Sequence, residues 1–226
     1  MNISKWLALI MTFLVMSACD KTTDVAGTNN ETHTKGTLFQ ANGEVAAGAR
    51  VRIFAADQNL SDSLPVTQTQ VDANGQVSLR LKRGYYSLLA DDTAHNAVFI
   101  DSVYSDGDTV RLPTDTLRKP GVIVGHVKVQ PWHSPTIAWV HLMRTDLFAK
   151  VDTSGAFTLS GVPAGTFDLV ATCDLGEYTP THRQARSFPD SILDVGLIDL
   201  VYNGLPPVTG LHADYERWLE KLAPEK

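Results

Sequence analysis

The constraint that most limits the fold of this chain is an internal repeat. Residues 36–54, GTLFQANGEVAAGARVRIF, align without gaps with residues 125–143, GHVKVQPWHSPTIAWVHLM. After a loop of different length in each copy, residues 71–90, VDANGQVSLRLKRGYYSLLA, correspond to residues 151–171, VDTSGAFTLSGVPAGTFDLVA. Self-similarity at this spacing predicts two tandem domains rather than one large fold.

Each copy alternates apolar and polar residues, as strands with one buried face do. The phrases DANG and DTSG predict tight turns in which Asp binds its own backbone and Gly takes a positive φ. The strands AFTLSGV and TFDLVATC, joined by VPAG, predict a β-hairpin with one apolar face. Six or seven short strands in roughly 85 residues predict an antiparallel β-sandwich for each copy, so we expect an all-β fold.

The repeated pattern resembles the carboxypeptidase regulatory-like domain, a transthyretin-like (prealbumin-like) β-sandwich. The residues that carry the resemblance in the second copy are Gly125, Val127, Ala138, Val140, Leu142, Asp152, Gly155, Phe157, Leu159, Val162, Pro163, Gly165, Phe167, Leu169 and Ala171. The first copy departs from it at Val77 and Arg83, where the pattern has an aromatic residue and proline. The resemblance implies sandwiches at 36–118 and 119–203, and such modules recur in envelope lipoproteins of plant-fibre-degrading bacteria. These residues are structural, so the resemblance implies a fold and no particular activity.

The pattern of the N-terminal residues predicts a targeting segment. A short polar start with Lys5 precedes the apolar run WLALIMTFLVM, which is too short to span a bilayer and suits a signal peptide over residues 1–18. The ending MSAC resembles a bacterial lipobox, although Met16 stands where Leu is usual; the alternative is an ordinary secretory peptide with a chance cysteine. Lipidation of Cys19 would anchor the protein in the cell envelope, at the outer membrane or the periplasmic face of the inner membrane. Residues 19–35 are polar and predict a flexible tether.

The tail, residues 204–226, has Tyr215, Trp218, Leu219 and Leu222 at the spacing of a short amphipathic helix. Three interpretations are open: the helix packs on the second sandwich, it docks a partner, or the tail is partly disordered.

Composition excludes several classes of function. A formal net charge of −6 without basic runs argues against nucleic-acid binding. The sequence has no nucleophile elbow, phosphate loop or zinc-protease motif, and its seven histidines form no metal-ligand doublet, so we expect no enzyme, no cofactor and no metal. Cys173 lies on the inward face of its strand and is expected to be an inert thiol.

One difference between the copies suggests a binding site. Where the first copy presents Arg50 and Arg52 outward, the second presents Trp139 and His141, with Trp132 in the preceding loop. Exposed tryptophan usually packs against something. Trp139 therefore either covers a contact between the domains, supports a neighbouring loop, or forms with Trp132 and His141 an aromatic platform for a sugar ring.

These observations predict a non-catalytic, membrane-anchored lipoprotein that acts as a scaffold or binding module. The alternatives are a carbohydrate-binding protein that uses Trp132, Trp139 and His141, and an accessory subunit that docks a partner through the C-terminal helix. The expected partners are the membrane, through the lipid, and a polysaccharide or an envelope protein.

Overall fold

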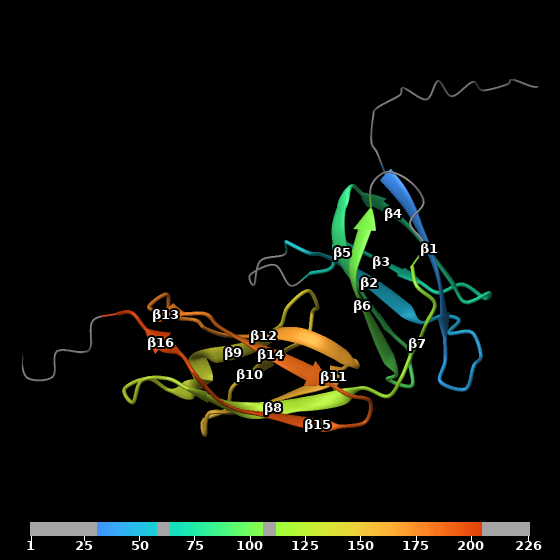
Figure 1. Ribbon diagram of the computed structural model, residues 1–226. Helices are drawn as coiled ribbons and strands as arrows, with labels where there is room; N and C mark the ends of the chain where they lie inside the picture. Colours follow the sequence, from blue (N-terminus) through green and yellow to red (C-terminus); the bar gives the residue numbers. More distant parts are fainter. Residues whose placement is uncertain (1–30, 58–63, 106–111, 205–226) are drawn as a thin grey trace, which may run out of the picture.

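The computed structural model describes residues 31–57, 64–105 and 112–204, and β-strands dominate this part of the chain (Figure 1). Its one helical element is a 3-10 turn, η1 (Pro135–Ile137). The predicted all-β fold is confirmed. The signal peptide, Cys19 and the predicted C-terminal helix lie outside the described residues.

The first sandwich consists of two sheets with strand orders β3-β2-β5-β6 and β4-β1-β7. Its strands are β1 (Glu31–Phe39), β2 (Arg50–Ala55), β3 (Thr67–Gln70), β4 (Gln76–Lys82), β5 (Gly84–Asp91), β6 (Ala97–Ser105) and β7 (Asp115–Thr116). All named pairings are antiparallel except β1 with β7, which is parallel.

The second sandwich has the corresponding strand orders β10-β9-β12-β14 and β11-β8-β15, with a small β13-β16 pair at one end. Its strands are β8 (Gly121–Lys128), β9 (Ala138–Leu142), β10 (Phe148–Lys150), β11 (Ala156–Val162), β12 (Gly165–Cys173), β13 (Tyr178–Thr179), β14 (Thr181–Ser187), β15 (Ile192–Asp199) and β16 (Val201–Tyr202). Here β15 runs parallel to β8. The smaller sheet of each sandwich is therefore mixed rather than purely antiparallel.

Each sandwich has its own hydrophobic core. The residues that align between the copies are buried in both cores, because period-two alternation places them on the inner faces of the sheets. The buried pairs are Leu38 and Val127, Ala49 and Ala138, Val51 and Val140, Ile53 and Leu142, Val77 and Phe157, Leu79 and Leu159, and Leu88 and Leu169.

The two predicted Asp turns are present. Asp152 Oδ1 accepts the backbone N–H of Ser154 at 2.8 Å and that of Ala156 at 2.9 Å, and Gly155 has a φ of +88°. Asp72 Oδ1 does the same for the backbone of residues 74 and 76. The hydroxyl of Ser154, which also donates to Asp152 Oδ1 at 2.7 Å, and the backbone hydrogen bonds to that oxygen hold the pKa of Asp152 below its ordinary value. The same kind of turn thus leads into β4 in the first copy and into β11 in the second.

The predicted hairpin between AFTLSGV and TFDLVATC is wrong. Strand β11 pairs with β8, whereas β12 pairs with β9 and β14, so the two strands belong to different sheets. Phe157 and Phe167 do point into one core, as expected, but they reach it from opposite sides. The VPAG segment therefore carries the chain from one sheet across to the other.

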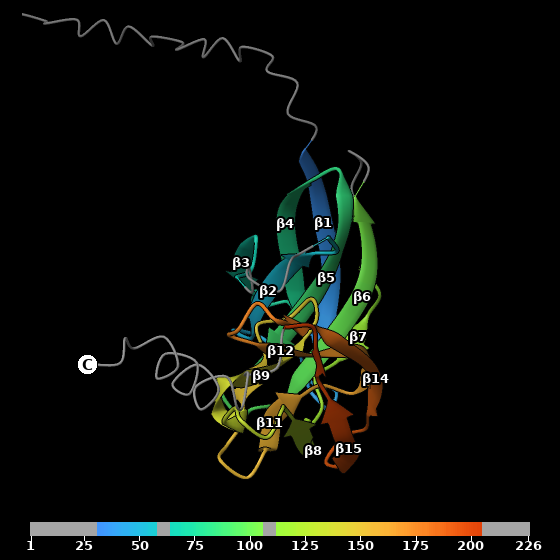
Figure 2. The same ribbon diagram turned by 90° about the vertical axis from the view of Figure 1, so that its left-hand side faces the viewer.

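The two sandwiches are joined through one face of the β3-β2-β5-β6 sheet. Register places Arg52, Leu89 and Phe99 side by side on that face. Leu89 is fully buried although it is not part of the first core, and the Phe99 ring lies 4.9 Å from that of Phe167 in the second core. The strands of the first sandwich run across those of the second (Figures 1 and 2).

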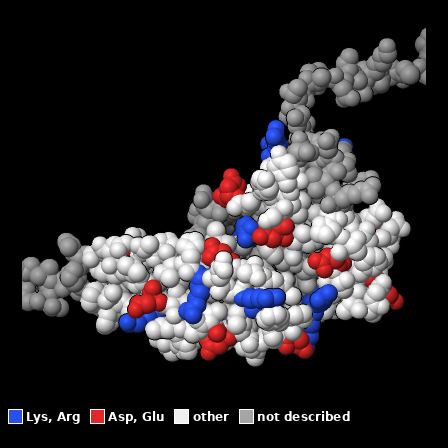
Figure 3. Space-filling view, viewed as in Figure 1, with Lys and Arg blue, Asp and Glu red and all other residues white. Residues whose placement is uncertain are grey.

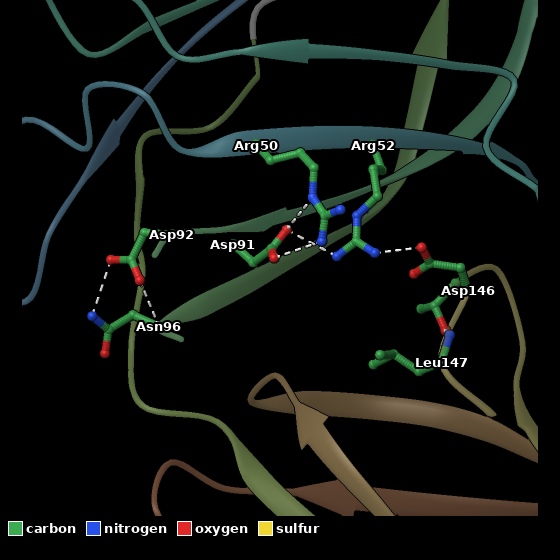
Figure 4. A network of polar contacts seen from close by, with 8 residues as sticks. Arg50, Arg52, Asp91, Asp92, Asn96, Asp146 and Leu147 are labelled. Carbon is green, nitrogen blue, oxygen red and sulfur yellow. Dashed lines mark hydrogen bonds and ion pairs between the residues drawn. The ribbon is translucent and has the colours of Figure 1, made fainter. Parts of the chain in front are cut away.

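Charged residues of both sandwiches complete this joint (Figure 4). Arg52 Nη1 donates to Asp146 of the second sandwich, and its Nη2 donates to Asp91 of the first at 2.9 Å. In the opposite direction, Arg144 donates to Asp101 at 2.6 Å. Arg52 points outward from its own core, as predicted, but its side chain is only 8% exposed because the second sandwich covers it. The outward face of β2 is an interface between the sandwiches.

Candidate binding site

Trp139 and His141 lie together on the outward face of β9, next to two residues of the edge strand β10. Phe148 is the register partner of His141, and Lys150 that of Trp139. The Phe148 ring lies 5.9 Å from both the Trp139 and the His141 rings, and Phe148 is 51% exposed. The result is a strip of three rings along the edge of the sheet, which we call the Trp139 strip.

The indole of Trp139 is already engaged within the protein. Its Nε1 donates to Asp174 Oδ1 at 2.9 Å, which ties β9 to the segment that follows β12. The Nζ of Lys150 lies 5.1 Å from the centre of the Trp139 ring, a cation–π contact. The indole N–H is therefore used and one ring face is covered.

His141 is a neutral packing residue in this environment. It is partly buried, and burial lowers its pKa because the charged imidazolium loses hydration. Its neighbour across the sheet is Val170, which is fully buried. These surroundings suit an uncharged ring better than a cation or a metal ligand.

Trp132 belongs to a separate cluster of rings. Its ring centre lies 6.2 Å from that of His133 and 5.8 Å from that of Tyr202, both in edge-to-face geometry. Tyr178 lies behind them, 5.6 Å from His133 and 5.1 Å from Tyr202. Trp132 is 45% exposed, and within the described residues its Nε1 has no hydrogen-bond partner.

A groove of about 430 Å³ runs beside this cluster, on the outer face of the β11-β8-β15 sheet. Its walls come from strand positions on that face and from the turn around Trp132. The lining residues are His126, Val127, Lys128, Val129, Gln130, Pro131, His133, Pro135, Ser154 and Leu197. Its size falls within the usual range of small-ligand sites, about 300–1,000 Å³.

A hollow of about 610 Å³ lies at one end of the first sandwich, between the loop after β1 and the β5–β6 turn. Gln40, Asn42, Glu44, Asp92 and Asn96 line it, and its lining includes no aromatic side chain. Asp92 holds Asn96 through both backbone and side-chain hydrogen bonds (Figure 4). The polar groups of this hollow are thus largely engaged with one another.

The structure brings together only part of the predicted site. Trp139 and His141 share one strip, whereas Trp132 lies in another cluster, and no ring contact joins Trp132 to Trp139 in the part of the chain that the structure describes. Sequence reasoning missed Phe148, which alternation in the segment LFAK could have placed beside His141. It also missed Tyr178 and Tyr202, because no local signal connects them to Trp132.

The described residues contain no group of three or more His, Cys, Asp or Glu side chains that could hold a metal ion. Within the same residues, no helix is long and apolar enough to cross a membrane. On the face seen in Figure 3, Lys and Arg are interspersed with Asp and Glu and form no large area of one sign.

No family model matches the sequence, and no curated protein matches it. Among solved structures, the chain is similar to GBS52, the minor pilin of Streptococcus agalactiae, with 12% identity, 79% of this chain and 99% of the pilin covered, and a TM-score of 0.37. A leucine-rich repeat protein from Bacteroides thetaiotaomicron matches with 9% identity, 75% and 26% coverage and a TM-score of 0.33. A streptococcal ancillary pilin matches with 10% identity, 75% and 63% coverage and a TM-score of 0.31. Similarity at this level transfers no function.

Proposed function

We propose that this protein is a non-catalytic scaffold of the bacterial cell envelope, in which a lipid on Cys19 holds two rigidly joined β-sandwiches to a membrane. The observation that supports the scaffold role is the joint between the sandwiches. Arg52 is buried between them and binds carboxylates of both, and Arg144 and Asp101 repeat the connection in the opposite direction. Such a joint favours a fixed spacer over two independently moving domains.

The arrangement of the chain supports the same proposal. We assign residues 1–18 to a signal peptide and the residues after it to a tether, which ends at residue 30 rather than at the predicted residue 35 because β1 begins at Glu31 and pairs there with β4. We assign the rest, in the predicted ranges 36–118 and 119–203, to two copies of a carboxypeptidase regulatory-like module, the first extended at its start by the beginning of β1. The corresponding strand orders of the two sandwiches favour this assignment. Stable anchoring needs more than one acyl chain, and the lipoprotein modification supplies several.

The anchor is tested on the full chain in a bacterial host that processes lipoproteins. Mass spectrometry of the mature N-terminus should show an acylated Cys19, and the protein should sediment with membranes. A Cys19→Ala variant should appear in the soluble periplasmic fraction. An unmodified cysteine, or a variant that stays with the membrane, would remove the anchored part of the proposal.

A second candidate function is polysaccharide binding by the second sandwich. The exposure of Trp132 beside a groove favours it, because solvent-exposed aromatic rings beside concave surfaces are typical of binding sites. Affinity electrophoresis in gels that contain soluble plant polysaccharides tests it, and unchanged migration in every gel would argue against it. Docking of a partner by the tail around Trp218 stays a prediction, since that segment lies outside the described residues.

A further inference from the structure

We infer that the groove beside Trp132, and not the Trp139 strip, is the sugar-binding site of the second sandwich, and that it takes the uncharged pyranose rings of a polysaccharide. This inference rests on the second candidate function above. It adds the location of the site and the class of sugar.

The walls of the groove match the two surfaces of a sugar ring. Pro131, Pro135 and Leu197 offer apolar surface, and Leu197 is 57% exposed. Gln130 and Ser154 add neutral polar groups along the same lining. A pyranose has an apolar C–H face and a rim of hydroxyl groups. Its C–H face can therefore pack on the apolar residues while its hydroxyl groups form hydrogen bonds with the polar ones.

His133 supplies a directed donor to this groove. Tyr178 is buried and accepts the backbone N–H of Gln130 at 3.0 Å, and its hydroxyl lies 2.8 Å from Nδ1 of His133. Burial also raises the pKa of Tyr178, which keeps the hydroxyl protonated. When the hydroxyl donates its hydrogen to Nδ1, His133 carries its own proton on Nε2 and can donate it to a ligand oxygen.

The charges that line the groove are balanced by partners outside its lining. Lys128 Nζ pairs with Asp199 at 3.2 Å. Asp152 binds the hydroxyl of Ser154 at 2.7 Å and interacts electrostatically with His126. Because no unpaired cation dominates the lining, an acidic sugar gains little over a neutral one, whereas a neutral ring meets both donors and acceptors.

The two tryptophans differ in what they leave free for a ligand. Trp139 uses its N–H on Asp174 and carries Lys150 against its ring. Among the residues that the structure describes, the N–H of Trp132 has no hydrogen-bond partner, and its ring neighbours His133 and Tyr202 contact it edge-to-face. A rigid aromatic ring with an unused donor binds a sugar at low entropic cost.

The test is isothermal titration of the full protein with three uncharged hexasaccharides, of β-1,4-linked glucose, xylose and mannose, and with hexagalacturonate as the charged comparison. We expect at least one uncharged ligand to bind more tightly than hexagalacturonate. Trp132→Ala should weaken that binding by about ten-fold or more, because it removes the exposed ring that adjoins the lining residues Pro131 and His133. Trp139→Ala, the matched control, should bind like the wild type.

Two further variants guard against misfolding and test the details. Leu197→Ser changes an exposed wall residue and should also weaken binding, and Tyr178→Phe should weaken it by releasing His133. Unfolding midpoints identify any variant that is merely unstable. Wild-type affinity in both Trp132→Ala and Leu197→Ser would overturn the inference, as would binding of hexagalacturonate alone. Loss of binding in Trp139→Ala only would overturn the assignment of the site to the groove but leave the proposal of polysaccharide binding in place. No binding to any polysaccharide or hexasaccharide would overturn both the assignment and the proposed function.

Discussion

Arg52 of the first sandwich donates a hydrogen bond to Asp146 of the second, although the two residues lie 94 positions apart in the chain. The pair is not fully satisfied, since Arg52 Nε and Asp146 Oδ1 are buried without a partner in the described part of the protein. A buried ion pair of this kind contributes little net stability, because the loss of hydration offsets the attraction, but it penalises every arrangement that separates the two charges. It therefore fixes how the sandwiches meet.

Removal of Arg52 should destabilise the protein far more than removal of its neighbour on the same strand. Arg52→Ala leaves Asp146 partly buried without its cation, which should lower the free energy of unfolding by about 3 kcal/mol. Arg50 is 54% exposed and binds Asp91 at the surface, so Arg50→Ala should cost less than about 1 kcal/mol. Urea unfolding of both variants measures the difference. Equal losses in the free energy of unfolding would show that the buried ion pair at the joint contributes no more stability than the exposed pair of Arg50.

The apolar part of the joint should also matter. Phe99 packs on the second core from a strand of the first sandwich, so Phe99→Ala should lower the free energy of unfolding by about 2 kcal/mol, less than a fully buried Phe would lose. It should also broaden the distribution of distances between spin labels placed on the two sandwiches. Phe148→Ala, at an exposed ring on β10, is the control and should leave that distribution unchanged. An equally narrow distribution in Phe99→Ala would contradict the rigid joint.

Alternation in the sequence predicts which residues face the core, but it cannot say which strands share a sheet. Phe157 and Phe167 are both inward-facing, and this is equally true of two strands in one hairpin and of two strands that face each other across a sandwich. The VPAG connection is short enough for either arrangement. The hairpin prediction failed for this reason, whereas the core positions were predicted correctly.

The joint and the Trp132 cluster could not be predicted because they depend on residues distant in the chain. Arg52 alternates with buried residues as a solvent-facing residue does, and only Asp146 and Phe99 reveal that its face is covered. In the same way, Trp132 and Trp139 look like neighbours in sequence. In the structure they lie in different places: Trp139 is on the outward face of β9, whereas the ring of Trp132 contacts the ring of Tyr202 in β16.

Gly125 on β8 should tolerate no side chain. A Cβ at this position would lie 2.8 Å from Val195 Cγ2 and 2.9 Å from the carbonyl oxygen of Gly196. Both neighbours are on the paired strand β15, so Gly125→Ala should force them apart and cost roughly 1–3 kcal/mol. Gly176, whose Cβ would meet nothing within 4 Å, is the matched control. Thermal unfolding that gives the same midpoint for both alanine variants would contradict this packing.

Cys173 should react slowly with alkylating reagents in the folded protein. Burial raises the pKa of its thiol, and the nearby carboxylates of Asp174 and Glu177 raise it further, so the reactive thiolate is scarce near pH 8. A Cys19→Ala variant leaves Cys173 as the only thiol in the chain. Iodoacetamide should modify it about ten-fold faster or more in guanidinium than in buffer, because unfolding restores the thiol's ordinary pKa near 8.5. Similar rates in the two solvents would show an accessible thiolate.

His141 should make the second sandwich sensitive to acid. Burial lowers its pKa in the folded state below the value of about 6.5 that it has in an unfolded chain. Between these two pKa values the unfolded state binds more protons than the folded state, so the free energy of unfolding falls as the pH drops through this window and is unaffected above it.

The other charged or titratable groups on this face include Lys150 beside Trp139, Asp174 bound to the Trp139 indole, the His182–Asp168 pair across β12 and Arg186 on β14, and none of them changes in the variant chosen for the test. His141→Gln removes the titrating ring and should lose less stability than the wild type between pH 7.5 and pH 5. Urea unfolding at several pH values measures both proteins, and the value for His141→Gln at pH 7.5 gives the plain packing cost of the substitution. If the two stability curves run parallel across this range, the acid response belongs to other groups and His141 is not the residue that senses the pH.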